Sequence, residues 1–134
     1  MMIAGISVAS RPAEILRAAQ EAIAYRLASV YDLLKTTLSE PERIVASGGA
    51  LLGTQGWVQM LADVLGRPVT ASAEEQASSK GAAMVALRGL GYVADYSEVE
   101  ALFGETFRPD MARHDVYRLA RARQEALYRM VGGG

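Results

Sequence analysis

The chain has 134 residues, of which 51% are hydrophobic, enough to fill one modest core in a single domain. Fourteen basic residues against fifteen acidic ones give a net charge of -1, so no overall field attracts nucleic acid or anionic lipid. The absence of cysteine excludes disulfides and thiolate metal sites, and the single histidine excludes an imidazole metal cluster.

Neither a membrane nor nucleic acid is an expected partner. Charged residues or glycines interrupt the apolar stretches well short of the roughly 20 residues that a spanning helix needs. The first ten residues lack the basic start and long apolar stretch of a signal peptide, so we expect a cytoplasmic protein. Five arginines lie between Arg113 and Arg129, but Asp115 and Glu125 are interleaved with them, which favours a solvated helix face.

The first predicted element is a long amphipathic helix over residues 12–38. Pro12 suits the first helical turn, and Ser10 is a plausible N-cap. Apolar residues recur every three or four positions, as on one helical face, at Ile15, Leu16, Ala19, Ile23, Leu27, Val30, Leu34 and Leu38.

A strand, a glycine turn and a second helix follow. Residues 43–47 are largely β-branched or apolar and run directly into Gly48 and Gly49, which predicts a short buried strand ending in a turn. From Thr54, a possible N-cap, apolar residues repeat at helical spacing until Gly66 ends the helix.

The remaining predicted elements are a strand over 68–71, a helix over 72–90, a short helix over 97–100 and a final helix over 109–130. Ser72 and Glu75 have the spacing of a capping box at the start of the second of these. Gly81 lies in the middle of that helix and costs about 1 kcal/mol relative to alanine, which predicts close backbone packing there.

The two predicted strands are joined through a helix, which favours a parallel pair with a right-handed crossover. A parallel pair alone buries little and leaves both edges without partners. We therefore expect that the natural fold has more strands, or that a second copy of the chain covers this sheet.

The glycine turn after the first strand is the candidate functional site. Glycine has no Cβ to obstruct a ligand, and the start of a helix offers unpaired N–H groups, so this arrangement can bring backbone next to a nucleotide. The segment from Ala46 to Thr54 matches neither GxGxxG nor GxxxxGK[ST]. On this pattern alone, plain turn geometry is favoured.

The glycine turn is the first of three sequence motifs that follow one another along the chain. SGGA at residues 47–50, GWVQMLADVLGRPV at residues 56–69 and ASSKGAA at residues 77–83 closely resemble the C-terminal domain of the FGGY carbohydrate kinases. FRPD at residues 107–110, followed by a tyrosine-bearing helix, is also similar. The resemblance runs from about Ile6 to Met130 and is strongest to the gluconokinase and xylulokinase branch.

The resemblance implies an α/β fold, a partial actin-like and ribonuclease-H-like ATPase domain, helix-rich with a short parallel strand pair. In this family two domains close over ATP with magnesium and a sugar. Gly48, Gly49 and Ala50 would give backbone contact with the adenine or nearby phosphate, and Thr54 would lie near the base. Gly81 and the next alanine would permit tight packing behind the turn.

The resemblance also implies that residues 1–134 are an incomplete C-terminal nucleotide-binding domain, without an N-terminal sugar-binding domain. The sugar-binding groups, the catalytic aspartate and the phosphate-gripping loops lie upstream in the family, so we expect no catalytic residue and no turnover in this chain alone. The whole enzyme would phosphorylate gluconate, xylulose or a related compound. The alternative is a non-catalytic helical module that self-associates, as a homodimer, through surface that the absent domain would cover.

Other polar and aromatic candidates receive structural interpretations. Asp63 is expected on a surface-facing turn, and His114 is expected to be exposed because adjacent helical side chains point apart. Glu74 and Glu75 are interpreted as carboxylates at a helix N-terminus, where the dipole favours negative charge. Trp57 is expected in the core because it lies in the apolar repeat.

Overall fold

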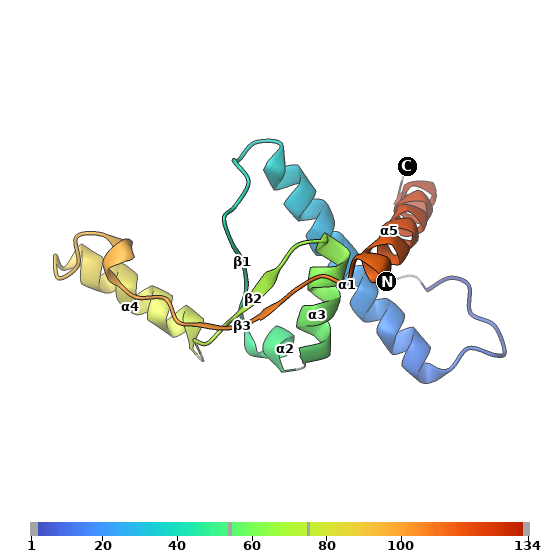
Figure 1. Cartoon of the computed structure of the whole chain (residues 1–134), viewed down its shortest axis with the longest axis horizontal. Helices are drawn as coiled ribbons and strands as arrows, with labels where there is room; N and C mark the ends of the chain where they lie inside the picture. The colour runs from blue at the N-terminus through green and yellow to red at the C-terminus, as the bar shows by residue number, and fades with distance from the viewer. Residues whose placement is uncertain (1–2, 54, 75, 133–134) are drawn as a thin grey trace.

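The computed structural model describes residues 3–53, 55–74 and 76–132. Figure 1 shows a central group of helices beside a small sheet, from which one helical arm projects. The elements in chain order are α1 (Pro12–Lys35), β1 (Ile44–Ala46), α2 (Gly49–Leu52), α3 (Gln55–Leu65), β2 (Val69–Ser72), α4 (Ala77–Gly89), the 3-10 helix η1 (Tyr96–Glu98), β3 (Phe103–Phe107) and α5 (Met111–Gly132).

The sheet has the strand order β1-β2-β3. The predicted parallel pairing is confirmed, with Ile44 opposite Val69. The third strand was not predicted; β3 runs antiparallel to β2, with Phe107 opposite Val69, and the hydroxyls of Thr70 and Thr106 lie 2.9 Å apart. The expectation of more than two strands is therefore correct within this chain, although β1 and β3 remain edge strands.

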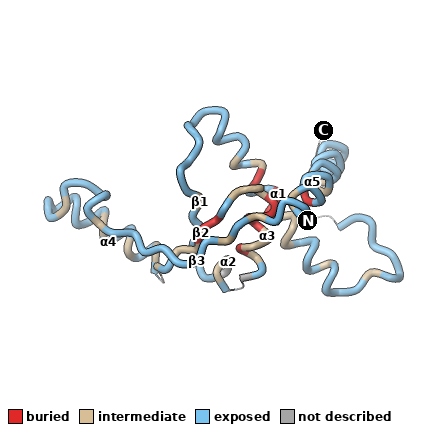
Figure 2. Tube along the Cα trace, in the orientation of Figure 1, coloured by how far each residue is buried: buried red, intermediate tan, exposed pale blue. Residues whose placement is uncertain are grey.

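The core lies where α1, α3 and α5 meet the sheet, and Figure 2 shows the buried residues gathered there. Small residues of α1, Ala24 and Ala28, are almost fully buried and let the helices approach closely. Tyr25 of α1 and Tyr117 of α5 meet edge to face, with ring centroids 6.2 Å apart. The core is completed by Ala46, Val58, Leu61, Ala62, Val64 and Val69.

Asp63 is buried within α3, with 1% of its surface exposed, so the expectation of a surface-facing turn is wrong. Its Oδ1 accepts hydrogen bonds from Gln59 Nε2 at 2.7 Å and from the N–H of Asp110 at 2.8 Å. Asp110 in turn accepts from the N–H of Ala112 at 2.9 Å, as a helix cap does. The buried carboxylate thus fixes where α5 starts relative to α3.

His114 is half-buried, so its expected exposure is also wrong. Its Nδ1 lies 2.9 Å from the carbonyl oxygen of Asp63, and its ring lies against Gly66. Gly66 has a φ of +64°, which residues other than glycine rarely adopt. A Cβ added there would lie 2.7 Å from the imidazole of His114. The histidine therefore serves as a packing contact between α5 and the end of α3.

The arm comprises α4, the following turn and η1, and it projects from the sheet end of the molecule (Figure 1). No residue of α4 is buried, and nothing lies within 4 Å of a Cβ added at Gly81, so the predicted close packing there is wrong within this chain. The predicted capping box is wrong as well. Ser72 ends β2 and α4 starts only at Ala77, while Glu75 lies outside the described residues; η1 is capped by Asp95.

Glu74 closes the base of the arm instead of capping a helix. Its Oε1 forms an ion pair with Lys80 Nζ and accepts from the N–H of Leu102 at 3.2 Å. Lys80 Nζ also donates to the carbonyl of Glu100 at 2.7 Å. The hydrogen bond from Lys80, followed by that from Leu102, lowers the pKa of Glu74 below its usual value of 4.5.

Titration of Glu74 should therefore loosen the base of the arm. Because its folded pKa is depressed, the carboxylate's stabilising effect is present above pH 4.5 and is lost as the pH falls through the folded pKa. The amide resonance of Leu102, followed by NMR from pH 6 to pH 3, should titrate with a midpoint below 4.5. A midpoint at or above 4.5, or the same titration in Glu74→Gln, would contradict this assignment.

Gly66→Ala and Gly81→Ala form a matched pair for stability. The first change meets both a positive φ and the His114 ring, and should lower the free energy of unfolding by about 2 kcal/mol or more. The second enters open space inside a helix and should raise it by up to about 1 kcal/mol. Urea denaturation of both variants measures the difference, and equal effects would show that the Gly66 contact is unimportant.

Candidate functional site

The glycine turn leaves the end of β1 and enters α2. Gly48 has a φ of +99°, so the chain reverses there in a conformation that favours glycine, and Gly48 is the N-cap residue of α2. Ser47, Gly48 and Gly49 are exposed. Among the described residues, nothing lies within 4 Å of a Cβ added at either glycine. These residues therefore leave the turn open: none of their side chains fills it, and they form no packed interior around it.

The backbone of α2 provides hydrogen-bond donors at this turn. The N–H groups of Leu51 and Leu52 donate to the carbonyl of Gly48 at 3.1 and 3.0 Å. The first amides of a helix, here those of Gly49 and Ala50, have no acceptor inside it. These two N–H groups suit an acceptor atom of a ligand, such as a phosphate or adenine ring nitrogen.

Partly buried leucines attach the turn to the rest of the domain. Leu51 and Leu52 pack against the core, and Ala46 at the end of β1 is buried. The exposed glycines are thus held between a paired strand and an anchored helical turn. Thr54, the fourth predicted site residue, lies outside the described residues.

Other residues predicted near the site are not brought to it. Gly81 lies in the exposed arm, and no described residue lies within 4 Å of a Cβ added there, so it does not pack behind the turn. Trp57 is only half-buried and lines a hollow between α1, α3 and α5, so its predicted core position is wrong. Sequence reasoning also missed the Gln59–Asp63–Asp110 contacts; the cap-like Pro-Asp before α5 was their only sequence signal.

Among the residues that the structure describes, no three His, Cys, Asp or Glu side chains gather as metal ligands would. Within the same ranges, no helix combines the length and apolar character needed to cross a membrane.

The sequence matches a known protein family. Residues 1–90 match the C-terminal domain of the FGGY family of carbohydrate kinases. The chain is 30% identical over 128 residues to a xylulose kinase of Staphylococcus epidermidis, covering 93% of this chain and 26% of the relative. It is 33% identical over 100 residues to glycerol kinase 1 of Thermotoga maritima, covering 72% and 20%.

Solved structures agree with this match. The xylulose kinase from Rhodospirillum rubrum superposes with a TM-score of 0.81 at 31% identity, over 97% of this chain and 27% of that one. The gluconate kinase from Lactobacillus acidophilus gives 0.78 at 24% identity, over 95% and 26%, and shows the shared fold alone.

These similarities define a carbohydrate-kinase domain with an actin-like, ribonuclease-H-like fold. The chain belongs to the FGGY family of carbohydrate kinases, and its residues 1–90 match that family's C-terminal domain. It spans about a quarter of the length of the relatives it matches.

Proposed function

We propose that this chain is the ATP-binding part of a carbohydrate kinase, which transfers the γ-phosphate of ATP to a hydroxyl of a sugar or sugar acid. Gluconate or xylulose is the proposed substrate class, because relatives named for both belong to the same family. Glycerol kinases match at similar identity, so a smaller polyol is the nearest competing substrate class.

The open turn at Gly48 and Gly49 is the observation that carries this proposal. Both glycines leave free the space that a Cβ would take, and two helix-start amides lie beside them. A flat base or a phosphate can therefore approach the backbone closely. Gly48, Gly49 and Ala50 are the proposed contacts with the nucleotide, and Thr54 is proposed to lie near the base.

Magnesium is the proposed cofactor of the whole kinase. The described residues supply no cluster of three metal-binding side chains, so the ion would be held by the phosphates of ATP and by groups outside this chain. Phosphoryl transfer depends on positioning and on stabilisation of charge by such groups. We therefore propose that the chain alone has no turnover.

Exposed apolar side chains on α1 are a proposed docking surface for the rest of the kinase. Leu16, Ile23, Leu27, Val30 and Leu34, here called the α1 stripe, share one face of the helix and are 44–65% exposed. Strand β1 next to them in the chain is a sheet edge. A contiguous apolar face and an open sheet edge are each typical of a surface that another part of a domain covers.

A valine at position 49 should block nucleotide binding without disturbing the fold. Gly49 lacks a positive φ and has open space around it, so the added side chain fills only the ligand's path. Isothermal titration with ADP should show binding to the unchanged chain and at least about tenfold weaker binding to Gly49→Val. Gly81→Val, which also enters open space but in the arm, should bind ADP normally.

Failure of the unchanged chain to bind ADP below millimolar concentration would reject it as a self-sufficient nucleotide site. Equal binding by Gly49→Val would reject the turn as the contact. A coupled assay with gluconate or xylulose should detect no ADP release, and turnover would overturn the proposal that the catalytic groups lie elsewhere.

The second candidate function is a helical module that self-associates through the α1 stripe. Successive residues of the stripe are seven, four, three and four positions apart in the sequence. This spacing places side chains along the face through which two helices pack side by side. In this case two copies of the chain would cover each other's exposed faces.

Sedimentation distinguishes a monomer from this dimer. If the stripe pairs two copies, Leu27→Glu should convert a micromolar dimer to a monomer, because a carboxylate would be placed in an apolar contact. Leu119→Glu, at an exposed leucine on α5 outside the stripe, is the control and should leave association unchanged. A strictly monomeric chain at micromolar concentration would contradict self-association.

A further inference from the structure

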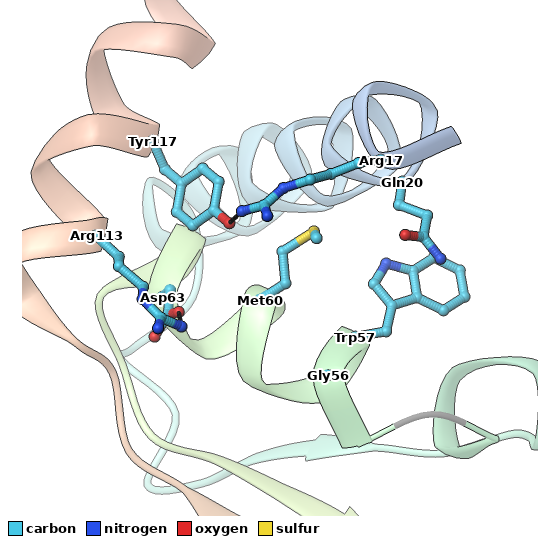
Figure 3. A pocket seen from close by; sticks show the side chains of 8 residues that line it. All are labelled: Arg17, Gln20, Gly56, Trp57, Met60, Asp63, Arg113 and Tyr117. Carbon is cyan, nitrogen blue, oxygen red and sulfur yellow. Dashed lines mark hydrogen bonds and ion pairs between the residues drawn. The ribbon is translucent and has the colours of Figure 1, made fainter. Parts of the chain in front are cut away.

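A hollow of about 390 Å³ lies between α1, α3 and α5; Gly56 at the start of α3 lines it, whereas Gly48 and Gly49 do not. This volume falls within the range of about 300–1,000 Å³ typical of small-ligand sites. Figure 3 shows the side chains that face it: Arg17 and Gln20 from α1, Trp57 and Met60 from α3, and Arg113 and Tyr117 from α5. Three segments far apart in sequence thus contribute to one surface.

The polar lining of the hollow combines the donors of Arg17, Arg113 and Tyr117 with the amide of Gln20 and the carboxylate of Asp63, which is an acceptor. Arg17 Nε donates to Glu21 at 2.9 Å and Nη2 donates to the hydroxyl of Tyr117 at 3.3 Å, which leaves its remaining N–H groups available. The hydroxyl proton of Tyr117 has no acceptor within the part of the chain that the structure describes. A ligand that offers several acceptor oxygens would match these groups.

Arg113 is held loosely at the other side of the hollow. Its Nη1 lies 3.7 Å from Asp63 Oδ2 and its Nε lies 3.4 Å from Asp110 Oδ2, both longer than a normal hydrogen bond. Its side chain is 63% exposed. Since Asp63 already accepts two shorter hydrogen bonds through Oδ1, the guanidinium can turn toward a ligand without leaving that carboxylate without partners.

The apolar part of the lining favours a ligand with a flat carbon skeleton. Trp57 and Met60 project from α3; in Figure 3 Met60 lies near the middle of the hollow and Trp57 lies beside Gln20, on the side opposite Arg113. The face of an indole carries negative charge density, which favours the C–H groups on one face of a sugar or polyol. Paired guanidiniums match the oxygens of a phosphate group, to which Arg can donate two parallel hydrogen bonds.

We propose that this hollow binds a small phosphorylated sugar or sugar acid, with Arg17 and Arg113 on the phosphate, the Tyr117 hydroxyl donating to an oxygen and Trp57 against the carbon skeleton. The ligand class is that of the product of the proposed kinase, so its physiological meaning rests on that function. The site is separate from the nucleotide turn, and its binding would make the domain responsive to accumulated product.

Trp57 is the only tryptophan in the chain, so its fluorescence reports directly on the hollow. At constant ionic strength, 6-phosphogluconate should change the emission in a saturable way. Gluconate lacks the phosphate group and inorganic phosphate lacks the carbon skeleton, so each should bind at least about tenfold more weakly than 6-phosphogluconate. The proposal would be overturned if 6-phosphogluconate caused no saturable change, or if gluconate or inorganic phosphate bound with equal affinity.

Arg113→Gln should weaken 6-phosphogluconate binding about tenfold, because one charged donor is removed. Arg17→Gln should have a similar effect, and circular dichroism of both variants checks that the fold is kept. Arg118→Gln is the matched control, since Arg118 lies on α5 outside the hollow, pairs with Asp115 and is 70% exposed. Unchanged binding in both test variants, or equal weakening in the control, would reject the arginine contacts.

Gly49→Val separates this inference from the proposed nucleotide site. If both proposals hold, the variant loses ADP binding and retains the Trp57 response to 6-phosphogluconate. A lost Trp57 response in Gly49→Val would overturn the independence of the hollow. Absent ADP binding with an intact Trp57 response in the unchanged chain would count against the nucleotide site alone.

Discussion

The buried carboxylate of Asp63 is the contact on which the arrangement of the helices depends. A carboxylate with 1% of its surface exposed is costly unless its oxygens are hydrogen-bonded, and here Gln59 and the N–H of Asp110 meet that requirement. Asp110 then caps α5, so the same group sets the start of that helix. The position of α5 in turn brings Tyr117 against Tyr25 of α1 and closes the three-helix layer.

This layer supports the glycine turn from behind while leaving it open in front. Helix α3 contacts both neighbouring helices and β2, and the short α2 is attached to the same core through Leu51 and Leu52. An exposed backbone held by a packed core suits ligand binding, because few groups then lose conformational freedom when a ligand binds. Apolar side chains remain exposed on α1, and none of the residues of α4 in the arm is buried.

Local patterns along the sequence predicted most of the elements. The apolar repeat gave α1, with its predicted end at residue 38 and its observed end at Lys35. The β-branched run before Gly48 gave β1, and both flanking helices and the parallel pairing were also predicted. The turn at Gly48 was recognisable because a positive φ is a property of one residue and its neighbours. The strand β3 was not, because its exposed residues lack an apolar alternation and it forms by pairing with β2.

The sequence by itself determined the family, most of the helices, the first two strands and the position of the glycine turn, because these depend on short-range spacing and backbone preference. Tertiary structure alone decided the burial of Asp63, the contact of His114 with Gly66 and the position of Trp57 beside Arg17 and Arg113. Each of these joins residues about 50 or more positions apart, or depends on which face of a helix the neighbouring elements cover. Side-chain periodicity specifies that a face is apolar, but only packing specifies what lies against it.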